Sequence, residues 1–251
     1  MSLNVKEVLE NQILFFQSID STNNYAASLI DADKAQNGIT IVAQRQTAGK
    51  GQRGNSWKDQ KDASLLMSLI IQPQATLDQQ FLFLATVATT VVKVLKPLLP
   101  ETAIYIKYPN DIIINDKKAG GILIENTIKG NTWAYAIIGI GINVLQTAFD
   151  QLSHAGSLYL ASAKSLDINN DLLYPIRTAL LQNCVKGLNR QELVEYNELL
   201  YKKGQYQLLN IDGQVLEVKI SSVDDLGALI VEHNDGTKQQ LIHGSFTWLW
   251  P

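Results

Sequence analysis

A glycine-rich loop is the first place where the sequence could carry chemistry. Residues 49–54 read Gly-Lys-Gly-Gln-Arg-Gly, so that Lys50 and Arg53 stand among three glycines. Glycine lets the backbone approach a ligand closely, and lysine and arginine pair with phosphate or carboxylate groups. The loop therefore predicts contact with an anionic ligand, although on its own it fits a solvated flexible connection equally well.

Two common nucleotide-binding motifs do not explain this loop. The spacing G-x-G-x-x-G matches dinucleotide-binding folds, but those need a helix that begins at the loop and an acidic residue about 20 residues later. Here residues 55–62 are polar, the next element is an apolar strand, and residues 70–72 are Ile-Ile-Gln. A P-loop is excluded because residues 55–56 are Asn-Ser, where Lys-Ser or Lys-Thr is needed.

Four further segments carry polar residues or glycines that could form a site. They are Ser21-Thr22-Asn23, residues 107–111 (Lys-Tyr-Pro-Asn-Asp), residues 118–125 (Lys-Ala-Gly-Gly-Ile-Leu-Ile-Glu) and residues 139–144 (Gly-Ile-Gly-Ile-Asn-Val). Each also has an ordinary structural interpretation: a helix cap, a turn, an exposed hairpin tip at Lys117-Lys118, and glycines that ease close strand packing. Considered singly, none of them identifies a function.

Together with residues 44–57, these segments resemble the signature segments of biotin protein ligases, also called holocarboxylase synthetases, in order and approximate spacing. The five segments extend from residue 21 to residue 144, and the C-terminal tail is similar to the family's small C-terminal domain. The resemblance implies a ligase that joins biotin and ATP into biotinyl-5'-AMP and pyrophosphate. The mixed anhydride then acylates a lysine of an acceptor protein.

The resemblance also implies roles for individual residues. Lys118 is the expected main electrostatic catalyst, because it matches the lysine that bridges the biotin carboxyl group and the α-phosphate, and Arg53 and Lys107 are the further catalytic candidates. The implied biotin-binding residues are Ser21, Thr22, Asn23, Gln46, Gly49, Lys50, Gly51, Gln52, Lys118, Gly120 and Gly121. The implied ATP- or adenylate-binding residues are Lys50, Arg53, Trp57, Asn110, Asp111, Lys118 and Asn143.

The chain departs from the family pattern at two loop positions. Lys50 stands where the family usually has arginine, and Gln52 stands where several relatives have another arginine. Lysine keeps the charge but loses the planar fork that binds an anion through two parallel hydrogen bonds. With Gln52, the loop carries one cation fewer than in those relatives.

The implied reaction uses biotin and ATP as substrates together with Mg²⁺, whose protein ligands the sequence does not identify. The family's usual acceptor is a biotin carboxyl carrier domain of a biotin-dependent carboxylase such as acetyl-CoA carboxylase. A homodimer is compatible with the resemblance, since exposed sheet edges can pair in this family. No DNA or membrane partner is expected.

Three other functions are weighed against this one. A lipoate or octanoate transferase shares the catalytic fold, but the basic loop followed by Trp57 and the segment 107–111 are similar to the biotin branch. A transcription regulator would need a helix-turn-helix unit of about 50 residues before the first strand, where this sequence has about a dozen. An inactive binding module is expected to lose the loop cations or Lys118, and all of these are present.

Composition agrees with an enzyme of the cytoplasm. The 251 residues are 46% hydrophobic and 18% charged, and the net charge of -3 argues against a protein that mainly coats nucleic acid. The N-terminus lacks the pattern of a signal peptide, and apolar stretches such as 134–144 are shorter than the roughly 20 residues that span a bilayer. The single cysteine, Cys184, is expected to be a buried structural thiol.

The elements that must position the site follow from hydrophobic periodicity and turn signals. Residues 20–23 are expected to supply side-chain acceptors that cap a helix ending at Ile30. We expect strands at 13–18, 39–44 and 64–71, a loop at 45–62, a helix at 77–99 that Pro97 and Pro100 end, an antiparallel meander at 104–108, 112–114, 122–128 and 133–144, and helices at 170–188 and 190–201.

From residue 204 onward, short strands separated by turn dipeptides predict a small β-barrel. The expected fold class is therefore α+β. A mixed or antiparallel sheet with helices forms a catalytic core, which by resemblance is like the class II synthetases, and a small SH3-like β-barrel follows it. The expected domains are residues 1–202 for biotin and ATP binding and residues 203–251 for the barrel.

Overall fold

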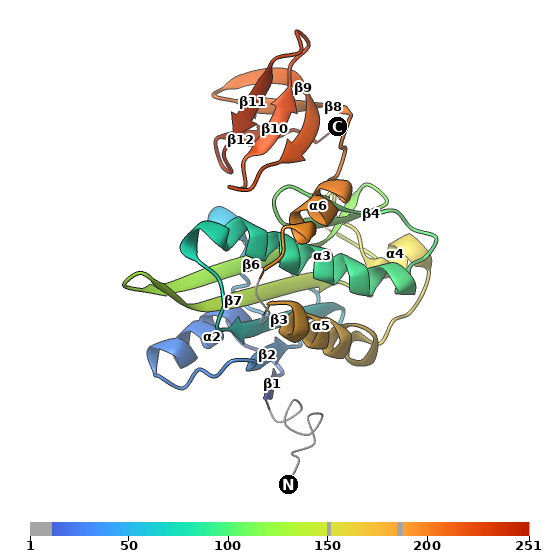
Figure 1. The fold of residues 1–251 in the computed structure, drawn as a ribbon. Helices are drawn as coiled ribbons and strands as arrows, with labels where there is room; N and C mark the ends of the chain where they lie inside the picture. Colours follow the sequence, from blue (N-terminus) through green and yellow to red (C-terminus); the bar gives the residue numbers. More distant parts are fainter. Residues whose placement is uncertain (1–11, 150–151, 185–187, 251) are drawn as a thin grey trace.

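The computed structural model describes residues 12–149, 152–184 and 188–250, and it confirms the α+β class. A seven-stranded mixed sheet carries the helices, and a five-stranded sheet follows it (Figure 1). The strands of the larger sheet are β1 (Ile13–Phe16), β2 (Thr40–Ala43), β3 (Ser64–Ile71), β4 (Ile104–Lys107), β5 (Asp111–Ile114), β6 (Lys117–Lys129) and β7 (Thr132–Asn143). The helical elements are α2 (Thr22–Asp31), η1 (Gln52–Gly54), η2 (Leu77–Gln79), α3 (Gln80–Leu98), α4 (Leu158–Ser162), η3 (Ile168–Leu173), α5 (Tyr174–Cys184) and α6 (Gln191–Glu198).

The larger sheet has the strand order β1-β2-β3-β7-β6-β5-β4. Its neighbouring strands are antiparallel except for the parallel pair β1 and β2. The predicted meander from β4 to β7 is confirmed, but β6 begins at Lys117 rather than at residue 122. Asn115 and Asp116 both have positive φ, 49° and 59°, which suits a tight two-residue hairpin turn, so the chain re-enters the sheet at once.

The two faces of the sheet have different partners. On β7 the side chains of Ile138, Ile140 and Ile142 belong to the main core, which they share with α3, α5 and α6. Ile137 belongs to a smaller cluster with Ala26 of α2 on the other face. Because side chains alternate along a strand, the odd-numbered residues of β7 share the face of α2. The candidate site lies on this face.

Helix α3 differs from the expectations in two ways: its segment is as long and apolar as a membrane span, and Pro97 lies inside it. The segment Leu77–Leu98 has 22 residues and a mean hydropathy of 1.6, so it is long and apolar enough to cross a membrane by length and composition. In the fold it is a core helix, since 61% of its most apolar window is buried, and Figure 1 shows it lying across the sheet. Pro97 does not end the helix, which continues to Leu98 with the proline inside its last turn.

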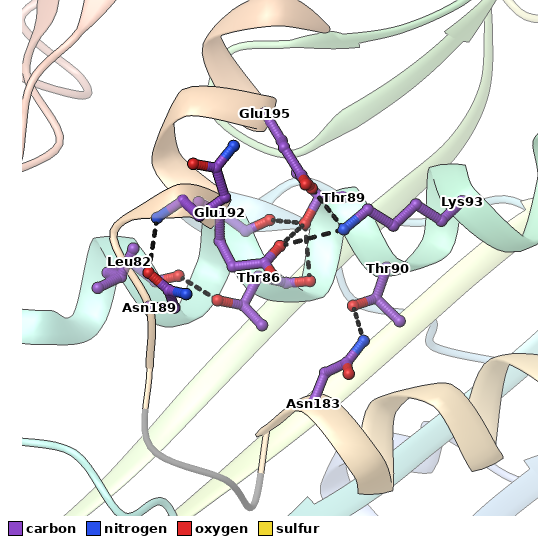
Figure 2. A network of polar contacts seen from close by, with 11 residues as sticks. Leu82, Thr86, Thr89, Thr90, Lys93, Asn183, Asn189, Glu192 and Glu195 are labelled. Atoms are coloured by element: carbon purple, nitrogen blue, oxygen red, sulfur yellow. Dashed lines mark hydrogen bonds and ion pairs between the residues drawn. The ribbon is translucent and has the colours of Figure 1, made fainter.

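Polar contacts join α3 to α5 and α6 (Figure 2). Thr89 Oγ1 donates a hydrogen bond of 2.9 Å to Glu192 Oε2 of α6, and Lys93 forms ion pairs with Glu192 and Glu195 of the same helix. Asn183 of α5 donates to Thr90 Oγ1 at 3.1 Å. These contacts fix α5 and α6 against α3.

The last three helical elements differ in detail from the prediction. The expected helix 170–188 is the π-helical turn η3 followed by α5, and residues 185–187 lie outside the described residues. The expected helix 190–201 is α6, which ends at Glu198. The short helix α4 was not predicted. Cys184 is 2% exposed, which confirms its expected burial.

The chain ends in an open sheet rather than a closed barrel. Its strands are β8 (Tyr206–Ile211), β9 (Gln214–Val223), β10 (Leu229–Glu232), β11 (Lys238–Leu241) and β12 (Phe246–Trp248). The order is β11-β10-β9-β8-β12, and the edge strands β11 and β12 do not pair with each other in the described residues. We call β8–β12 and their turns the C-terminal sheet. Its buried residues, such as Val218 and Leu229, join the core of the larger sheet.

Candidate active site

A pocket of about 540 Å³ opens on the face of the sheet that carries α2. Its walls come from the start of α2, the glycine loop, the turn between β4 and β5, the glycines of β6 and β7, and the turn that precedes β12. The pocket therefore joins segments that the sequence places more than 200 residues apart, from Ser21 to Trp248.

One end of the pocket is lined by uncharged polar groups at the start of α2. Ser21 occupies the N-cap position but makes no side-chain capping bond, so the expectation that it caps the helix is wrong. Thr22 N and Thr22 Oγ1 donate to Gln46 Oε1 at 2.8 and 3.1 Å. Ser68 Oγ donates to Asn23 Oδ1 at 2.5 Å and lies 2.7 Å from Thr22 Oγ1. These bonds fix the polar side chains in place, as a site for a neutral polar ligand requires.

Ser68 and Glu125 do not line the pocket but hold the lining side chains Thr22 and Asn23, and neither was predicted as a site residue. Asn23 Nδ2 donates to Glu125 Oε2 at 2.7 Å, and Lys50 Nζ lies 3.3 Å from Glu125 Oε1. Glu125 is the last residue of segment 118–125, one of the segments that resemble the family's, so the sequence offered a reason to select it. For Ser68 the available signal was a polar residue inside the fully buried strand β3.

A β-bulge decides which lysine enters the pocket. Ile112 pairs with Gly120 while Ile113 pairs with Lys118, so Ala119 is an extra residue on β6. An extra residue reverses which side chains face each side of a strand. Lys118 consequently faces the pocket, and its Nζ lies 2.7 Å from Asp111 Oδ1. Lys117 instead donates to Ser153 O at 2.7 Å.

The neighbouring residue Asn110 is also held by the protein. Its Nδ2 donates to Ile122 O at 2.5 Å and ties the turn after β4 to β6. The described residues contain no group of three or more His, Cys, Asp or Glu side chains that could hold a metal ion. Asp111 is the acidic residue among the described lining residues, and it is already paired with Lys118. The geometry therefore does not fit a metal ion held mainly by protein ligands.

Lys107 is a nearly buried cation at the other end of the pocket. It is 9% exposed, and its Nζ lies 5.2 Å from the ring centre of Trp248 and 5.0 Å from that of Trp250. Desolvation by burial lowers the pKa of Lys107, while the charge of Asp111 opposes that shift. No carboxylate of the described residues lies within 4 Å of Lys107 Nζ. A desolvated lysine of this kind is suited to an anionic ligand.

The glycine loop closes over the middle of the pocket. Gly51 N donates to Asn55 O at 2.7 Å, and Trp57 N donates to Gly49 O at 2.9 Å. The indole of Trp57 lies on Gly141, where a Cβ atom would come within 2.6 Å of the ring. Lys118 Nζ lies 5.9 Å from the centre of the same ring. The glycine at 141 is therefore needed for the tryptophan to lie flat on the sheet.

The C-terminal sheet supplies one wall of the pocket, which the sequence did not indicate. His243, Gly244, Phe246, Thr247 and Trp248 line it. The guanidinium group of Arg53 packs against Gly244, so the glycine loop touches this wall. Tyr108 Oη donates to Gly227 O at 2.6 Å and anchors a second turn of the C-terminal sheet beside the pocket.

Comparison with known proteins agrees with this geometry. Residues 15–143 match the Biotin/lipoate A/B protein ligase family. The bifunctional ligase/repressor BirA of Bacillus subtilis is 30% identical over 93% of this chain and 73% of that protein. The chain belongs to this family.

Two solved structures of family members have the same fold. The biotin protein ligase of Aquifex aeolicus in complex with biotin and ATP superimposes with a TM-score of 0.77 at 21% identity, covering 95% of this chain and 98% of that one. The biotin protein ligase of Leishmania major in complex with biotinyl-5-AMP has a TM-score of 0.65 at 25% identity, covering 92% and 98%. The first likeness concerns the fold alone.

Most of the residues implied by the family resemblance line the pocket. They are Ser21, Thr22, Asn23, Gln46, Lys50, Gly51, Gln52, Arg53, Trp57, Lys107, Asn110, Asp111, Lys118 and Gly121. Three do not line it. Gly49 lies against Trp57 O, Gly120 lies against Gly141 O, and Asn143 is 5% exposed and donates to Gly156 O at 3.0 Å. Ligand contacts by the lining residues and by these three are all predictions.

Proposed function

We propose that the chain is an ATP-dependent biotin protein ligase. It forms biotinyl-5'-AMP from biotin and ATP and then transfers the biotinyl group to a lysine of a biotin carboxyl carrier domain of a carboxylase. The observation that carries the proposal is the composition of a single pocket, in which fixed neutral polar groups and fixed cations face one cavity. The Leishmania major structure reported above is named as a biotin protein ligase in complex with biotinyl-5-AMP, which favours biotin over lipoate or octanoate.

The neutral polar end suits biotin. Its ureido ring is uncharged and needs hydrogen-bond donors and acceptors, which Thr22, Asn23 and Gln46 supply in fixed positions. Glu125 holds Asn23 from one side and Lys50 from the other. The arrangement orients a polar ring without offering it a free charge.

The cationic groups suit the first half-reaction, in which the biotin carboxylate attacks the α-phosphate of ATP. Two anions must approach each other, and negative charge grows on the phosphate as pyrophosphate leaves. Lys118 is preorganised by its ion pair with Asp111, and Arg53 and Lys107 add positive charge to the same pocket. Fixed cations in a partly desolvated site stabilise such a transition state. We propose that Mg²⁺ enters as a complex with ATP, because the described residues offer no protein-held metal site.

We further propose residues 1–202 as the catalytic domain and residues 203–251 as the C-terminal domain. The larger sheet and its helices belong to the first range, and the C-terminal sheet begins at Tyr206 in the second. The net charge of -3 supports a reaction partner other than DNA, and the carrier domain is the partner proposed here. We also propose a cytoplasmic location and no membrane partner. A homodimer that forms through exposed sheet edges is a further proposal.

Mass analysis of the acceptor tests the proposal. The protein is incubated with biotin, ATP, Mg²⁺ and a purified carrier domain, and the carrier is then weighed. We expect an increase by one biotinyl group that depends on ATP and on the acceptor lysine. Parallel reactions contain lipoate or octanoate in place of biotin. Modification by either of these acids but not by biotin would overturn the proposal in favour of a lipoyl-type ligase.

A further inference from the structure

The C-terminal sheet is held firmly enough for its side chains to take part in catalysis. Asn197 of α6 makes two hydrogen bonds with the backbone of Val223, at 2.9 and 2.6 Å. Tyr108 Oη bonds to Gly227 O on the neighbouring turn. Lys107 Nζ lies 5.2 Å from the ring centre of Trp248 and 5.0 Å from that of Trp250. The turn between β11 and β12, residues 242–245, is therefore fixed relative to the floor of the pocket.

His243 lies on this turn and faces the pocket. Of the three histidines in the sequence, it is the one that lines the cavity; His233 bonds to Gln239, and His154 stacks on Trp250. Its side chain is accessible to solvent, and its ring meets the ring of Tyr108 edge to face at 6.0 Å. An accessible imidazole at the edge of a reaction pocket can exchange protons with both a substrate and water.

The second half-reaction needs such a proton acceptor. At neutral pH the acceptor lysine arrives as an ammonium group, which has no free electron pair. One proton must leave before the nitrogen can form a bond to the acyl carbon of biotinyl-AMP. As this bond forms, the bond from the acyl carbon to the phosphate oxygen breaks, and AMP leaves with the electron pair. The nitrogen loses a second proton to water as the amide forms.

The other ionisable groups of the pocket are poor acceptors for the first proton. Asp111 Oδ1 is already engaged in an ion pair with Lys118 Nζ at 2.7 Å. Lys107 is nearly buried beside two indole rings and is not accessible to an incoming side chain. The hydroxyl of Tyr108 donates to a backbone carbonyl, and desolvation raises its pKa well above the usual range. Lys50, Arg53 and Lys118 are cations.

We propose that His243 accepts the proton of the incoming lysine in the second half-reaction, an inference that rests on the proposed function. A ring nitrogen takes the proton from the ammonium group and later returns it to solvent. The free amine then attacks the adenylate, while Lys118 and Arg53 hold the phosphate of the departing AMP.

The surroundings of His243 keep its imidazole uncharged and ready for this role. Desolvation is the largest cause that lowers the pKa of His243, and the charge of Arg53 lowers it further. Asp111 acts in the opposite direction but does not cancel these two effects. The neutral ring of Tyr108 faces the imidazole of His243. Residues 242–248 contain no ionisable group besides His243. Arg53 also favours rapid release of the accepted proton to water.

Separate measurement of the two half-reactions tests the inference with the full-length chain. Biotinyl-AMP formation is followed by pyrophosphate release, and transfer is followed in a single turnover from isolated biotinyl-AMP to the carrier domain. His243→Asn keeps a polar side chain at an accessible position and removes the base. We expect adenylate formation within about twofold of the parent and a transfer rate at pH 7 that falls about 100-fold. His233→Asn, on the same sheet but outside the pocket, is the matched control and should leave both rates unchanged.

Two further readouts separate a base from a structural role. The parent's transfer rate should fall as the pH drops through the pKa of His243, whereas the variant's rate should rise steadily with hydroxide concentration. Hydroxylamine is uncharged at neutral pH and needs no base, so its acylation should proceed equally in parent and variant. An unchanged transfer rate in His243→Asn, or equal losses with lysine and hydroxylamine, would overturn the inference. A loss confined to adenylate formation would assign His243 to phosphate binding instead. A parent enzyme that forms no biotinyl-AMP would overturn the proposed function itself.

Discussion

Lys118 Nζ and Asp111 Oδ1 form an ion pair of 2.7 Å across the β5–β6 hairpin, and a single extra residue in β6 makes it possible. The carboxylate fixes a long, flexible side chain in the pocket before any substrate arrives. Such preorganisation reduces the reorganisation that would otherwise accompany the growth of charge in the transition state. The hairpin geometry, rather than the lysine alone, therefore defines the catalytic centre.

The first prediction concerns the two adjacent lysines of this hairpin. Lys118→Ala should reduce biotinyl-AMP synthesis about 100- to 1000-fold, because the variant loses the cation nearest the proposed site of reaction. Lys117→Ala should keep most of the activity, since Lys117 does not line the pocket and its Nζ donates to Ser153 O instead. Pyrophosphate release measures both variants. Equal losses in the two, or a fully active Lys118→Ala enzyme, would contradict the assignment.

The second prediction concerns the close contact between Gly139 and Asn23. A Cβ atom at residue 139 would lie 2.3 Å from Asn23 Oδ1, so Gly139→Ala should displace the Asn23 amide and raise the KM for biotin about tenfold. The KM for ATP should change little. In the background of Asn23→Ala the clash is absent, and Gly139→Ala should add no further loss. Additive effects of the two substitutions would show that the glycine acts in another way.

The sequence predicts the order of elements well where local signals are strong. The meander from β4 to β7 follows from alternating β-branched runs and from turn dipeptides such as Asn115-Asp116. The five motif segments likewise identify most residues of the pocket wall. Local patterning does not reveal the bulge at Ala119, because an alanine among glycines carries no distinctive signal. The resemblance pointed to Lys118, and the bulge gives the physical reason.

The remaining site residues could not be found from the sequence because tertiary packing places them. His243 and Trp248 belong to the C-terminal sheet, whose position depends on contacts with Tyr108 and Asn197. None of these contacts leaves a periodic or motif signal. Helix α3 shows the opposite difficulty: its composition alone also suits a membrane span, and only its burial against the sheet distinguishes the two.

The third prediction concerns Cys184 and pH. Burial raises the pKa of the Cys184 thiol from 9.0 to about 12 in the folded protein. Above pH 9 the unfolded chain loses this proton while the folded protein keeps it, so the free energy of unfolding falls as the pH rises from 9 to 12. The contribution at pH 10 is about 1.4 kcal/mol.

Urea unfolding of the parent and of Cys184→Ala at pH 8 and pH 10 measures this effect. Subtracting the variant from the parent removes the contributions of tyrosines and lysines that titrate in the same range. The stability advantage of the parent over the variant should shrink by about 1.4 kcal/mol between the two pH values. A difference that does not change with pH would show that the folded thiol ionises as easily as the unfolded one. Alkylation of Cys184 should also require unfolding.

The last prediction concerns the motion of the glycine loop. Its residues from 53 to 56 are exposed, and three backbone hydrogen bonds, donated by Gly51, Asn55 and Trp57, lie within it. Few buried contacts therefore offset the conformational entropy that the loop loses when it is ordered. We expect the loop to exchange its amide hydrogens rapidly in the free enzyme and slowly with biotinyl-AMP, whose phosphate Arg53 would bind. A closed loop would also protect the anhydride from water.

Hydrogen exchange of peptides covering residues 49–57, with and without biotinyl-AMP, measures this closure, and peptides from β7 serve as a reference that is protected in both states. Arg53→Ala should release the adenylate at least about tenfold faster than the parent. The substitution removes the guanidinium group through which the loop contacts Gly244. Arg45→Ala is the matched control, since Arg45 is an exposed cation near the loop that does not line the pocket. Unchanged protection with ligand, or equal adenylate retention by Arg53→Ala and the parent, would show that the loop is a fixed wall and that other groups shield the anhydride.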